Sequence, residues 1–213
     1  MQLVEKYRPH QLAQFAGVER PKAILSRFVA APYSSAWLFT GPSGCGKTTM
    51  AMAVCETIGA QLHHIPSRQC NLEEVERVVQ SCHYMPMFGQ RFHLVLVDEA
   101  DQMSKAAQHA FLSVLDATNP PPDTIFIFTA NGVTGLEDRF ISRCRSLEFD
   151  GENIDMTRLL CAVFEAEARE MGIDPMKLDS SKWPSFSAIC KRAKGNVRRA
   201  LMELELDISL LTA

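Results

Sequence analysis

The sequence lacks the features of several large protein classes. Its seven cysteines are odd in number and widely spaced, with no Cys-X-X-Cys pair, which argues against a disulfide framework or a zinc ribbon and favours a reducing compartment. No apolar run approaches the roughly 20 residues that cross a bilayer, and the charged, proline-containing start MQLVEKYRPH is unlike a secretory signal. We therefore expect no membrane partner, and a location in the cytoplasm or, in a eukaryote, the nucleus.

Charge of one sign is also lacking, because 22 lysines and arginines nearly cancel 25 aspartates and glutamates. This balance argues against a strongly basic, free-standing nucleic-acid binder, although it leaves room for a local basic face on an assembled ring. The length of 213 residues is enough for one large domain, or for a medium domain followed by a small one.

The first 150 residues alternate between short apolar runs and helical patterns. The expected strands are 36–40, 61–65, 93–98, 124–130 and 146–149, and the expected helices are 47–59, 71–83 and 104–117. Asn71, with Glu74 three residues later, and Ser104 are the expected N-caps. Apolar strands that alternate with helices predict an α/β domain over residues 1–150, with a parallel sheet covered on both faces.

The pattern changes after Asp150, because the rest of the chain contains no strand signal. Three helices are expected there, at about 153–171, 181–194 and 196–211. Gly172 and Gly195 are expected to end the first two. The sequence therefore predicts a small all-helical domain over residues 151–213.

The segment GPSGCGKT (41–48) follows an expected strand and precedes an expected helix, which is the context of a phosphate-binding loop. Its glycines let the backbone turn tightly and direct N–H groups at phosphate oxygens. Lys47 brings a charge to the outer phosphates, and Thr48 offers a hydroxyl to Mg²⁺. The alternative, a glycine-rich turn with a chance lysine, fits the flanking strand and helix poorly. The expected nucleotide contacts of the loop are Gly41, Pro42, Ser43, Gly44, Cys45, Gly46, Lys47, Thr48 and Thr49.

Two other expected strands end in polar residues. Ligands of open α/β sheets bind at the carboxyl ends of the strands, so Asp98 is expected to hold Mg²⁺ and Glu99 to take a proton from an attacking water. Such a base favours hydrolysis over phosphate transfer to a small molecule. Asn131 is expected to hold the attacking water. The alternatives are two solvated acids in a turn and a turn-forming asparagine.

Together these motifs resemble those of AAA+ ATPases. The similarity to the clamp-loader branch, the small subunits of replication factor C, covers nearly the whole chain. The matching segments are LVEKYRP (3–9), GVERPKAIL (17–25), DEAD (98–101), TAN (129–131), SRC (142–144) and GNVRRAL (195–201). The resemblance implies a P-loop AAA+ sheet followed by a helical lid, with ATP and Mg²⁺ as ligands. From the residues alone, the first of these segments is predicted only to be an irregular N-terminal arm.

The resemblance also implies residue roles outside the loop. Arg198 would reach from the lid to the γ-phosphate, although arginines in the first turn of a helix are often simply solvated. Arg143 would be supplied to the nucleotide of a neighbouring subunit, where an arginine finger neutralises charge on the phosphoryl group. Arg139 and Arg145 do not align with that role and are interpreted as solvated or interface charges. The residues around the base and ribose would be Val4, Tyr7, Arg8, Pro9 and Val18.

The leading functional hypothesis is an ATP-hydrolysing subunit of a clamp-loader-like ring on DNA, in replication or repair. Its expected partners are other AAA+ subunits of the same or of another kind, DNA, and a sliding clamp. Arg68 and Lys105 are candidates for contacts with the DNA backbone, and plain surface charge is the alternative. Clamp-loader subunits usually continue into a helical collar, which is expected to be missing after Ala213. The competing hypothesis is a nucleotide-gated module that assembles or recruits a partner and hydrolyses ATP slowly.

Overall fold

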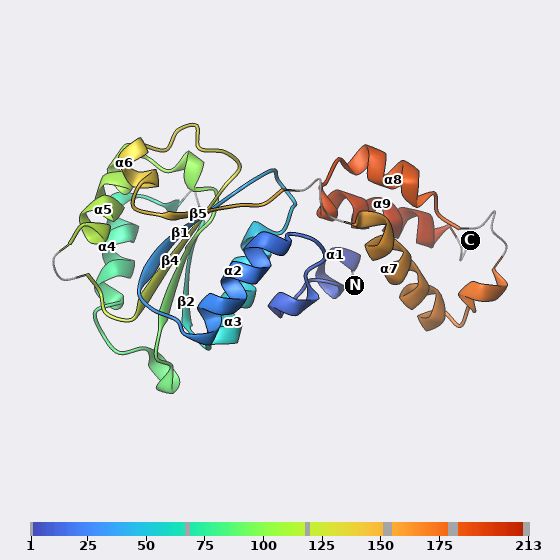
Figure 1. The fold of residues 1–213 in the computed structure, drawn as a ribbon, viewed down its shortest axis with the longest axis horizontal. Helices are drawn as coiled ribbons and strands as arrows, with labels where there is room; N and C mark the ends of the chain where they lie inside the picture. Colours follow the sequence, from blue (N-terminus) through green and yellow to red (C-terminus); the bar gives the residue numbers. More distant parts are fainter. Residues whose placement is uncertain (1, 67–68, 118–119, 151–154, 179–182, 211–213) are drawn as a thin grey trace.

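The computed structural model describes residues 2–66, 69–117, 120–150, 155–178 and 183–210. These residues form an elongated molecule, with a sheet-containing part at one end and a group of C-terminal helices at the other (Figure 1). Over the described ranges, no helix has both the length and the hydropathy that crossing a bilayer requires.

All the strands of the central sheet run parallel, in the order β2-β3-β4-β1-β5. They are β1 (Ser35–Thr40), β2 (Gln61–Ile65), β3 (His93–Val97), β4 (Thr124–Ala130) and β5 (Arg145–Glu148). Every residue of β3 and β4 is buried, because a central parallel strand is covered on both faces. The predicted parallel α/β sheet is confirmed.

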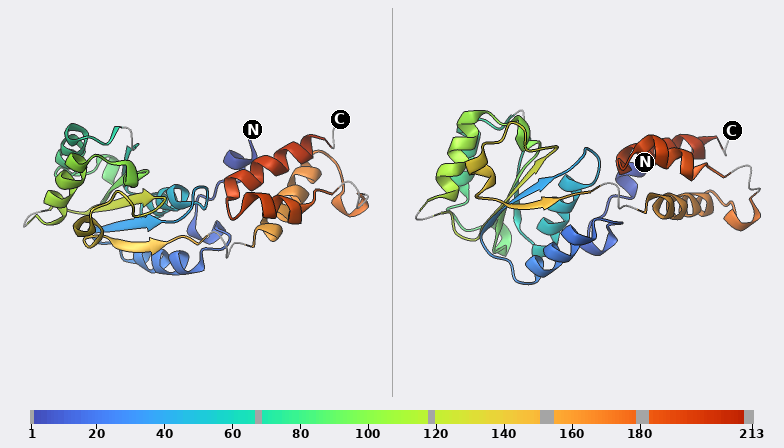
Figure 2. Two further views of the ribbon diagram at one scale, coloured as in Figure 1. Left: turned by 90° about the horizontal axis from the view of Figure 1, so that it is seen from above. Right: turned by 45° about the horizontal axis from the view of Figure 1, so that its top comes forward.

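Helices cover both faces of this sheet (Figures 1 and 2). One face carries α2 (Glu19–Ala30) and α3 (Lys47–Ile58), and the other carries α4 (Leu72–Ser81), α5 (Lys105–Leu115) and α6 (Asp138–Ile141). The rings of Phe111 and Phe140 meet Phe128 of β4 edge-on, with centroid distances of 5.0 and 4.9 Å. These aromatic contacts fix α5 and α6 on the sheet. Short 3-10 helices lie at η1 (Leu12–Gln14), η3 (Met87–Gly89), η4 (Ala100–Gln102) and η5 (Pro175–Lys177).

Both predicted N-caps are present. The side chain of Asn71 accepts a hydrogen bond from the backbone N–H of Glu74 at 2.9 Å, and that of Ser104 accepts one from Ala107 at 3.2 Å. The Glu74 carboxylate binds Arg77 at 2.8 Å instead of completing the predicted capping box. An arginine three residues along a helix competes effectively for a carboxylate in the first turn.

The N-terminal arm is more regular than predicted from the residues alone. It contains α1 (Leu3–Lys6), η1 and the long helix α2. Pro21 obscures α2 in the sequence, but it occupies the first turn, where a missing N–H removes no intrahelical hydrogen bond. Residues 3–30 are therefore mostly helical.

The C-terminal part consists of α7 (Met156–Glu170), α8 (Phe186–Ala193) and α9 (Val197–Ser209), packed around a core of their own. Its second helix begins later than predicted, after Pro184, because the residue before a proline disfavours helical angles. The N-terminal arm also joins this core. Leu3 is buried in it, and Glu167 of α7 accepts hydrogen bonds from Lys6 Nζ at 2.6 Å and from the Tyr7 hydroxyl at 2.7 Å. The two ends of the chain thus pack together beside the sheet.

Candidate active site

The carboxyl ends of the strands face the C-terminal helices, as the arrowheads in Figure 2 show. After β1 the chain forms a tight loop and enters α3. Gly41 and Gly44 have φ angles of +147° and +78°, a region that residues with a Cβ rarely adopt. A Cβ on Gly41 would lie 2.2 Å from the carbonyl oxygen of Phe149, and one on Gly44 would lie 2.1 Å from Oδ1 of Asn196. The loop therefore needs glycine both for its backbone angles and for its close neighbours.

Lys47 points back into this loop. Its Nζ donates to the carbonyl oxygens of Gly41 at 2.7 Å and Pro42 at 2.9 Å, and to Oδ1 of Asn131 at 3.2 Å. Burial lowers the pKa of the Lys47 ammonium. Over the described ranges Lys47 makes no salt bridge, so its charge is held by neutral oxygens. A partly desolvated cation in that environment is suited to an incoming anion.

Asp98 follows β3 and contacts side chains from α3, β4 and β2. Its Oδ1 accepts hydrogen bonds from the hydroxyls of Thr48 at 2.7 Å and Thr129 at 2.8 Å, and its Oδ2 lies 3.0 Å from Nε2 of His64. The Thr48 hydroxyl and the Asp98 carboxylate are adjacent hard oxygen donors, which are the ligands that Mg²⁺ prefers. These two residues therefore fit a magnesium ion. No motif in the sequence points to His64, which reaches Asp98 from the edge strand β2.

Glu99 and Asn131 lie beside this pair. Glu99 has a φ angle of +50°, and its backbone N–H donates to the Thr129 hydroxyl at 3.2 Å. A non-glycine residue in this left-handed region is strained, which is common at functional sites. The backbone N–H of Asn131 donates to Oδ1 of Asp101 at 3.2 Å. The Asn131 amide oxygen is engaged with Lys47, so this side chain fixes the lysine as well as facing the cavity.

Two adjoining cavities open at this edge of the sheet. A polar cavity of about 420 Å³ is lined by Lys47, Thr48, Asp98, Glu99 and Asn131, among others. A mainly apolar cavity of about 120 Å³ lies between the N-terminal arm, the loop and the C-terminal helices. The residues that line both are Arg8, Gly44, Gly46, Thr49 and Arg198. The two cavities therefore form one continuous cleft.

The apolar cavity contains most of the residues that the resemblance assigns to the base. Those present are Val4, Tyr7, Arg8 and Pro9. Val18 does not line it, because its side chain is 5% exposed and belongs to the sheet core at the start of α2. In its place Phe15 and Ala16 face the cavity from the arm, and Leu159 and Leu201 face it from α7 and α9. Sequence reasoning missed these four, because they look like ordinary core residues of their segments.

The first turn of α9 rests directly on the phosphate loop. The backbone N–H of Val197 donates to the carbonyl oxygen of Gly44 at 3.0 Å, and the Asn196 side chain caps α9 while lying against Gly44. Arg198 is exposed and lines both cavities. Within the part of the chain that the structure describes, Arg198 forms no ion pair, whereas Arg199 pairs with Glu203 at 3.1 Å. Arg198 is thus the available cation at the mouth of the cleft.

The other candidate cations lie outside the cleft. Arg143 follows α6, is exposed, and pairs through Nε with Asp116, while its Nη1 donates to the Ser142 hydroxyl at 3.0 Å. Arg145 is exposed but stacks over the rings of Tyr33 and Trp37 at 5.1 and 5.7 Å, so it has partners within its own chain. Lys105 is an exposed residue in the first turn of α5. Arg68 lies outside the described residues.

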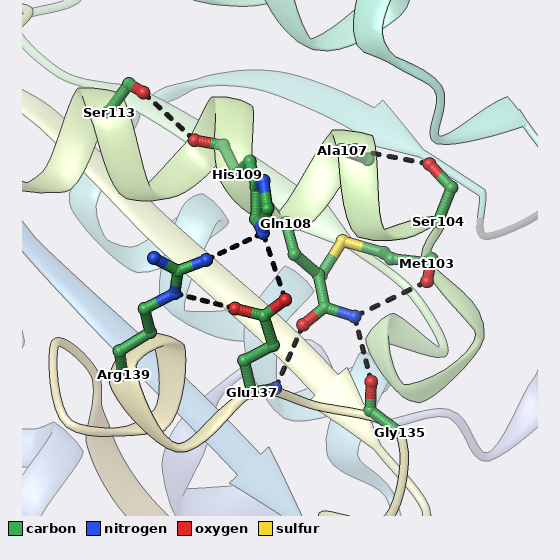
Figure 3. A network of polar contacts seen from close by, with 9 residues as sticks. All are labelled: Met103, Ser104, Ala107, Gln108, His109, Ser113, Gly135, Glu137 and Arg139. Atoms are coloured by element: carbon green, nitrogen blue, oxygen red, sulfur yellow. Dashed lines mark hydrogen bonds and ion pairs between the residues drawn. The ribbon is translucent and has the colours of Figure 1, made fainter.

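Figure 3 shows why the turn before Arg143 is held firmly against α5. Gln108 is 1% exposed, and its side chain donates to the Gly135 carbonyl at 2.8 Å and accepts from the Glu137 backbone N–H at 3.0 Å. Arg139 binds the Glu137 carboxylate at 2.7 Å and lies 2.7 Å from Nε2 of His109. Arg139 is exposed, as predicted. Its contacts with Glu137 and His109 lie within its own chain and brace this turn.

Comparison with known proteins gives consistent relatives. Residues 37–150 match the family described as "ATPase family associated with various cellular activities (AAA)". Replication factor C small subunit 1 of Pyrobaculum aerophilum is 30% identical over 210 residues, covering 95% of this chain and 60% of that protein. The replication factor C large subunit of Thermococcus kodakarensis is 26% identical over 214 residues, covering 97% and 40%. The chain thus spans 60% or less of the length of these two curated relatives.

Solved structures share the fold. The RuvB Holliday junction branch migration motor of Thermotoga maritima has a TM-score of 0.71 and 22% identity, covering 93% of this chain and 64% of that chain. At this level of identity the likeness concerns the fold alone. It includes the C-terminal helices as well as the sheet, because it covers nearly the whole chain.

The contact between Gly44 and Asn196 can be tested with a matched pair of glycine variants. Gly44 and Gly59 both have positive φ angles, of +78° and +67°, but a Cβ on Gly59 would meet nothing within 4 Å. Both alanine variants should lose stability from backbone strain of ~1–2 kcal/mol. Only Gly44→Ala should also displace α9, lowering affinity for a fluorescent ADP analogue by about tenfold. Equal affinities in the two variants would rule out docking of α9 on the loop as a requirement for binding.

Proposed function

The chain belongs to the ATPase family associated with various cellular activities (AAA), and from that premise we propose that it binds ATP with Mg²⁺ in the cleft and hydrolyses it within an assembly. One observation carries the proposal: Lys47, Thr48, Asp98 and Glu99 line the same polar cavity, which continues into an apolar one. A nucleoside triphosphate has the same division into an apolar base and a polyanion.

The proposed binding mode follows the chemistry of the two cavities. The base lies in the apolar cavity, between Tyr7 and Phe15 of the N-terminal arm and Leu201 of α9. The phosphates lie over the loop, where backbone N–H groups at the start of α3 and the Lys47 ammonium meet them. Arg198 then reaches the outermost phosphate from α9. Binding thereby joins the C-terminal helices to the phosphate loop.

The proposed reaction is attack of a water molecule on the γ-phosphorus. Glu99 takes the water proton as the new P–O bond forms, and the bond to the β,γ-bridging oxygen breaks to release ADP. Thr48 and Asp98 would hold Mg²⁺, which neutralises charge on the β- and γ-phosphates. Asn131 keeps Lys47 in place through its amide oxygen and faces the water from β4. All of these groups come from one edge of one sheet.

Arg143 is proposed to act on the nucleotide of a neighbouring subunit. It does not line the cleft of its own chain, it is exposed, and it stands on a turn that Gln108 and Glu137 brace against α5. A rigid support suits a residue that must reach a neighbour in a fixed orientation. Its present partner, Asp116, would be exchanged for a phosphate oxygen on assembly.

We further propose that the assembly works on DNA, in replication or repair. The support is the similarity to proteins named replication factor C subunits. Lys105, an exposed residue in the first turn of α5, is a candidate for a contact with the DNA backbone. Contacts between helix N-termini and DNA phosphates do not depend on the base sequence. Other AAA+ subunits and a sliding clamp are the corresponding proposed partners.

The base assignment is tested by Glu99→Gln. The variant keeps the shape of the side chain but cannot accept the proton, so turnover should fall by about 100-fold or more while nucleotide binding is retained. Glu73→Gln, at an exposed position of α4, is the matched control and should hydrolyse normally. The measurement is phosphate release, with and without primed DNA, beside equilibrium binding. Unchanged turnover in Glu99→Gln would exclude Glu99 as the base. Negligible turnover in the parent chain, with ATP-dependent oligomers, would favour the nucleotide-gated assembly module.

The role of Arg143 in a neighbour's site is tested by mixing variants. Arg143→Ala should bind nucleotide but lose turnover by ~10³-fold or more, whereas Arg169→Ala, at an exposed position of α7, should keep it. A mixture of Arg143→Ala and Glu99→Gln chains should regain part of the activity, because one chain supplies the arginine and the other the base. The readout is phosphate release from the mixture. If the variants co-assemble and no activity returns, Arg143 does not act across subunits.

A further inference from the structure

A second cluster of polar side chains lies away from the nucleotide cleft. It consists of His63 of β2, Cys82 at the end of α4 and His93 at the start of β3. One nitrogen from each histidine and the cysteine sulfur all lie within 4.8 Å of one another. Cys82 is 0% exposed, His93 is 2% exposed and His63 is half-buried. Asp98 follows the other end of β3, so the cluster and the cleft are at opposite ends of the strand.

The pairing of β2 with β3 brings the two histidines together. His63 lies opposite Val95, and His93 lies opposite Gln61, so the two histidines are diagonal neighbours on one face. The next residue, His64, has the opposite orientation and reaches Asp98 instead. The face that carries His63 is the one on which α4 packs, which explains how Cys82 reaches it.

Hydrogen bonds determine which nitrogens are available. Nε2 of His93 lies 2.8 Å from the carbonyl oxygen of Tyr84, which can only accept, so Nε2 carries the proton and Nδ1 carries a lone pair. Nε2 of His63 then donates to that Nδ1 at 2.9 Å. An imidazole whose second nitrogen donates to a backbone carbonyl is oriented as metal-binding histidines are. His93 Nδ1 is therefore presented toward His63 and Cys82 in a fixed direction.

The thiol at this cluster is protonated in the absence of a cation. Burial raises the pKa of Cys82 to about 11, although its contact with Thr124 acts in the opposite direction. Burial, together with the nearby His93 and Arg77, lowers the pKa of His63. His63 is thus suited to be a neutral ligand. A cation that binds here must displace the thiol proton.

We propose that His63 Nε2, His93 Nδ1 and Cys82 Sγ bind a thiophilic divalent cation, of which Zn²⁺ is the representative. On binding, the thiol proton is released to solvent, and the His63 proton moves from Nε2 to Nδ1. Two imidazoles and one thiolate are the donor set that zinc prefers in tetrahedral sites, with the fourth position left for water. A metal ion placed there replaces the hydrogen bond between the two histidines.

The site would stabilise one edge of the sheet. β2 is one of the two edge strands and pairs only with β3 among the described strands, and a cation shared by β2, β3 and the end of α4 would join all three. It would also close the segment that runs from Cys82 to His93. Binding to the folded state alone raises stability by mass action. The expected effect is a zinc-dependent rise in the unfolding temperature.

The test uses the full chain, with Zn²⁺ for affinity and Co²⁺ as a spectroscopic probe of thiolate coordination. The parent chain should retain about one equivalent of Zn²⁺ after gel filtration and release about one proton from the thiol on binding. With Co²⁺ it should show a thiolate-to-cobalt charge-transfer band. Cys82→Ala should lose this band, and His63→Gln should bind Zn²⁺ about 100-fold more weakly, since even the loss of a residue that only orients a ligand costs roughly 10–100-fold.

Matched controls separate this site from other thiols and histidines. Cys70→Ala removes another buried free cysteine, and His83→Gln removes the exposed histidine beside Cys82. Both should bind like the parent chain. His63 is half-buried, so its glutamine variant is expected to fold, and circular dichroism checks this. The proposal is overturned if the parent chain shows no thiolate band, or if Cys82→Ala and a folded His63→Gln bind both metals as tightly as the controls do.

Discussion

Because the five strands that the structure describes run parallel, a crossover must join each to the next one along the chain, and their carboxyl ends all lie along one edge of the sheet. This constraint brings together residues that are far apart in the sequence. Lys47 follows β1, Asp98 follows β3 and Asn131 follows β4, yet Lys47 donates a hydrogen bond to Asn131, and Asp98 accepts hydrogen bonds from Thr48 and Thr129 beside them. Besides the residues at this edge, the proposed chemistry needs only a surface that covers the nucleotide and one arginine from a neighbouring subunit.

The closing surface comes from both ends of the chain. The N-terminal arm binds Glu167 of α7 through Lys6 and Tyr7, and the first turn of α9 binds the phosphate loop through Val197. The apolar cavity therefore exists only where the arm, the loop and the C-terminal helices meet. A ligand that fills it contacts all three, so its differential contacts can bias their relative arrangement. Through these contacts, a bound nucleotide could change the position of the C-terminal helices relative to the sheet.

Local patterns in the sequence were enough to predict the sheet, the phosphate loop and the acidic strand end. The strands β1, β3 and β4 are dominated by apolar runs, whereas the edge strands β2 and β5 are more polar. Lys47 and Asp98 follow such apolar runs within recognisable motifs. The apolar cavity was harder to predict from the sequence. Phe15 and Leu201, which line it, are typical core residues whose position depends on packing between distant segments. The cluster of His63, Cys82 and His93 has no metal-binding spacing at all. The pairing of β2 with β3 and the packing of α4 bring these three residues together. Neither of these tertiary contacts can be predicted from the local sequence pattern.

The most direct test of the nucleotide site is a comparison of Mg·ATP-analogue binding to the parent chain, to Lys47→Ala and to Lys177→Ala, by titration calorimetry. Lys177 has a side chain that is 85% exposed, on a 3-10 turn of the C-terminal part. Lys47 should be required because its buried ammonium is held toward the loop by the neutral oxygens of Gly41, Pro42 and Asn131. The expected result is binding by the parent chain and by Lys177→Ala, and its loss in Lys47→Ala. Equal binding by all three chains would contradict the assignment of the cleft.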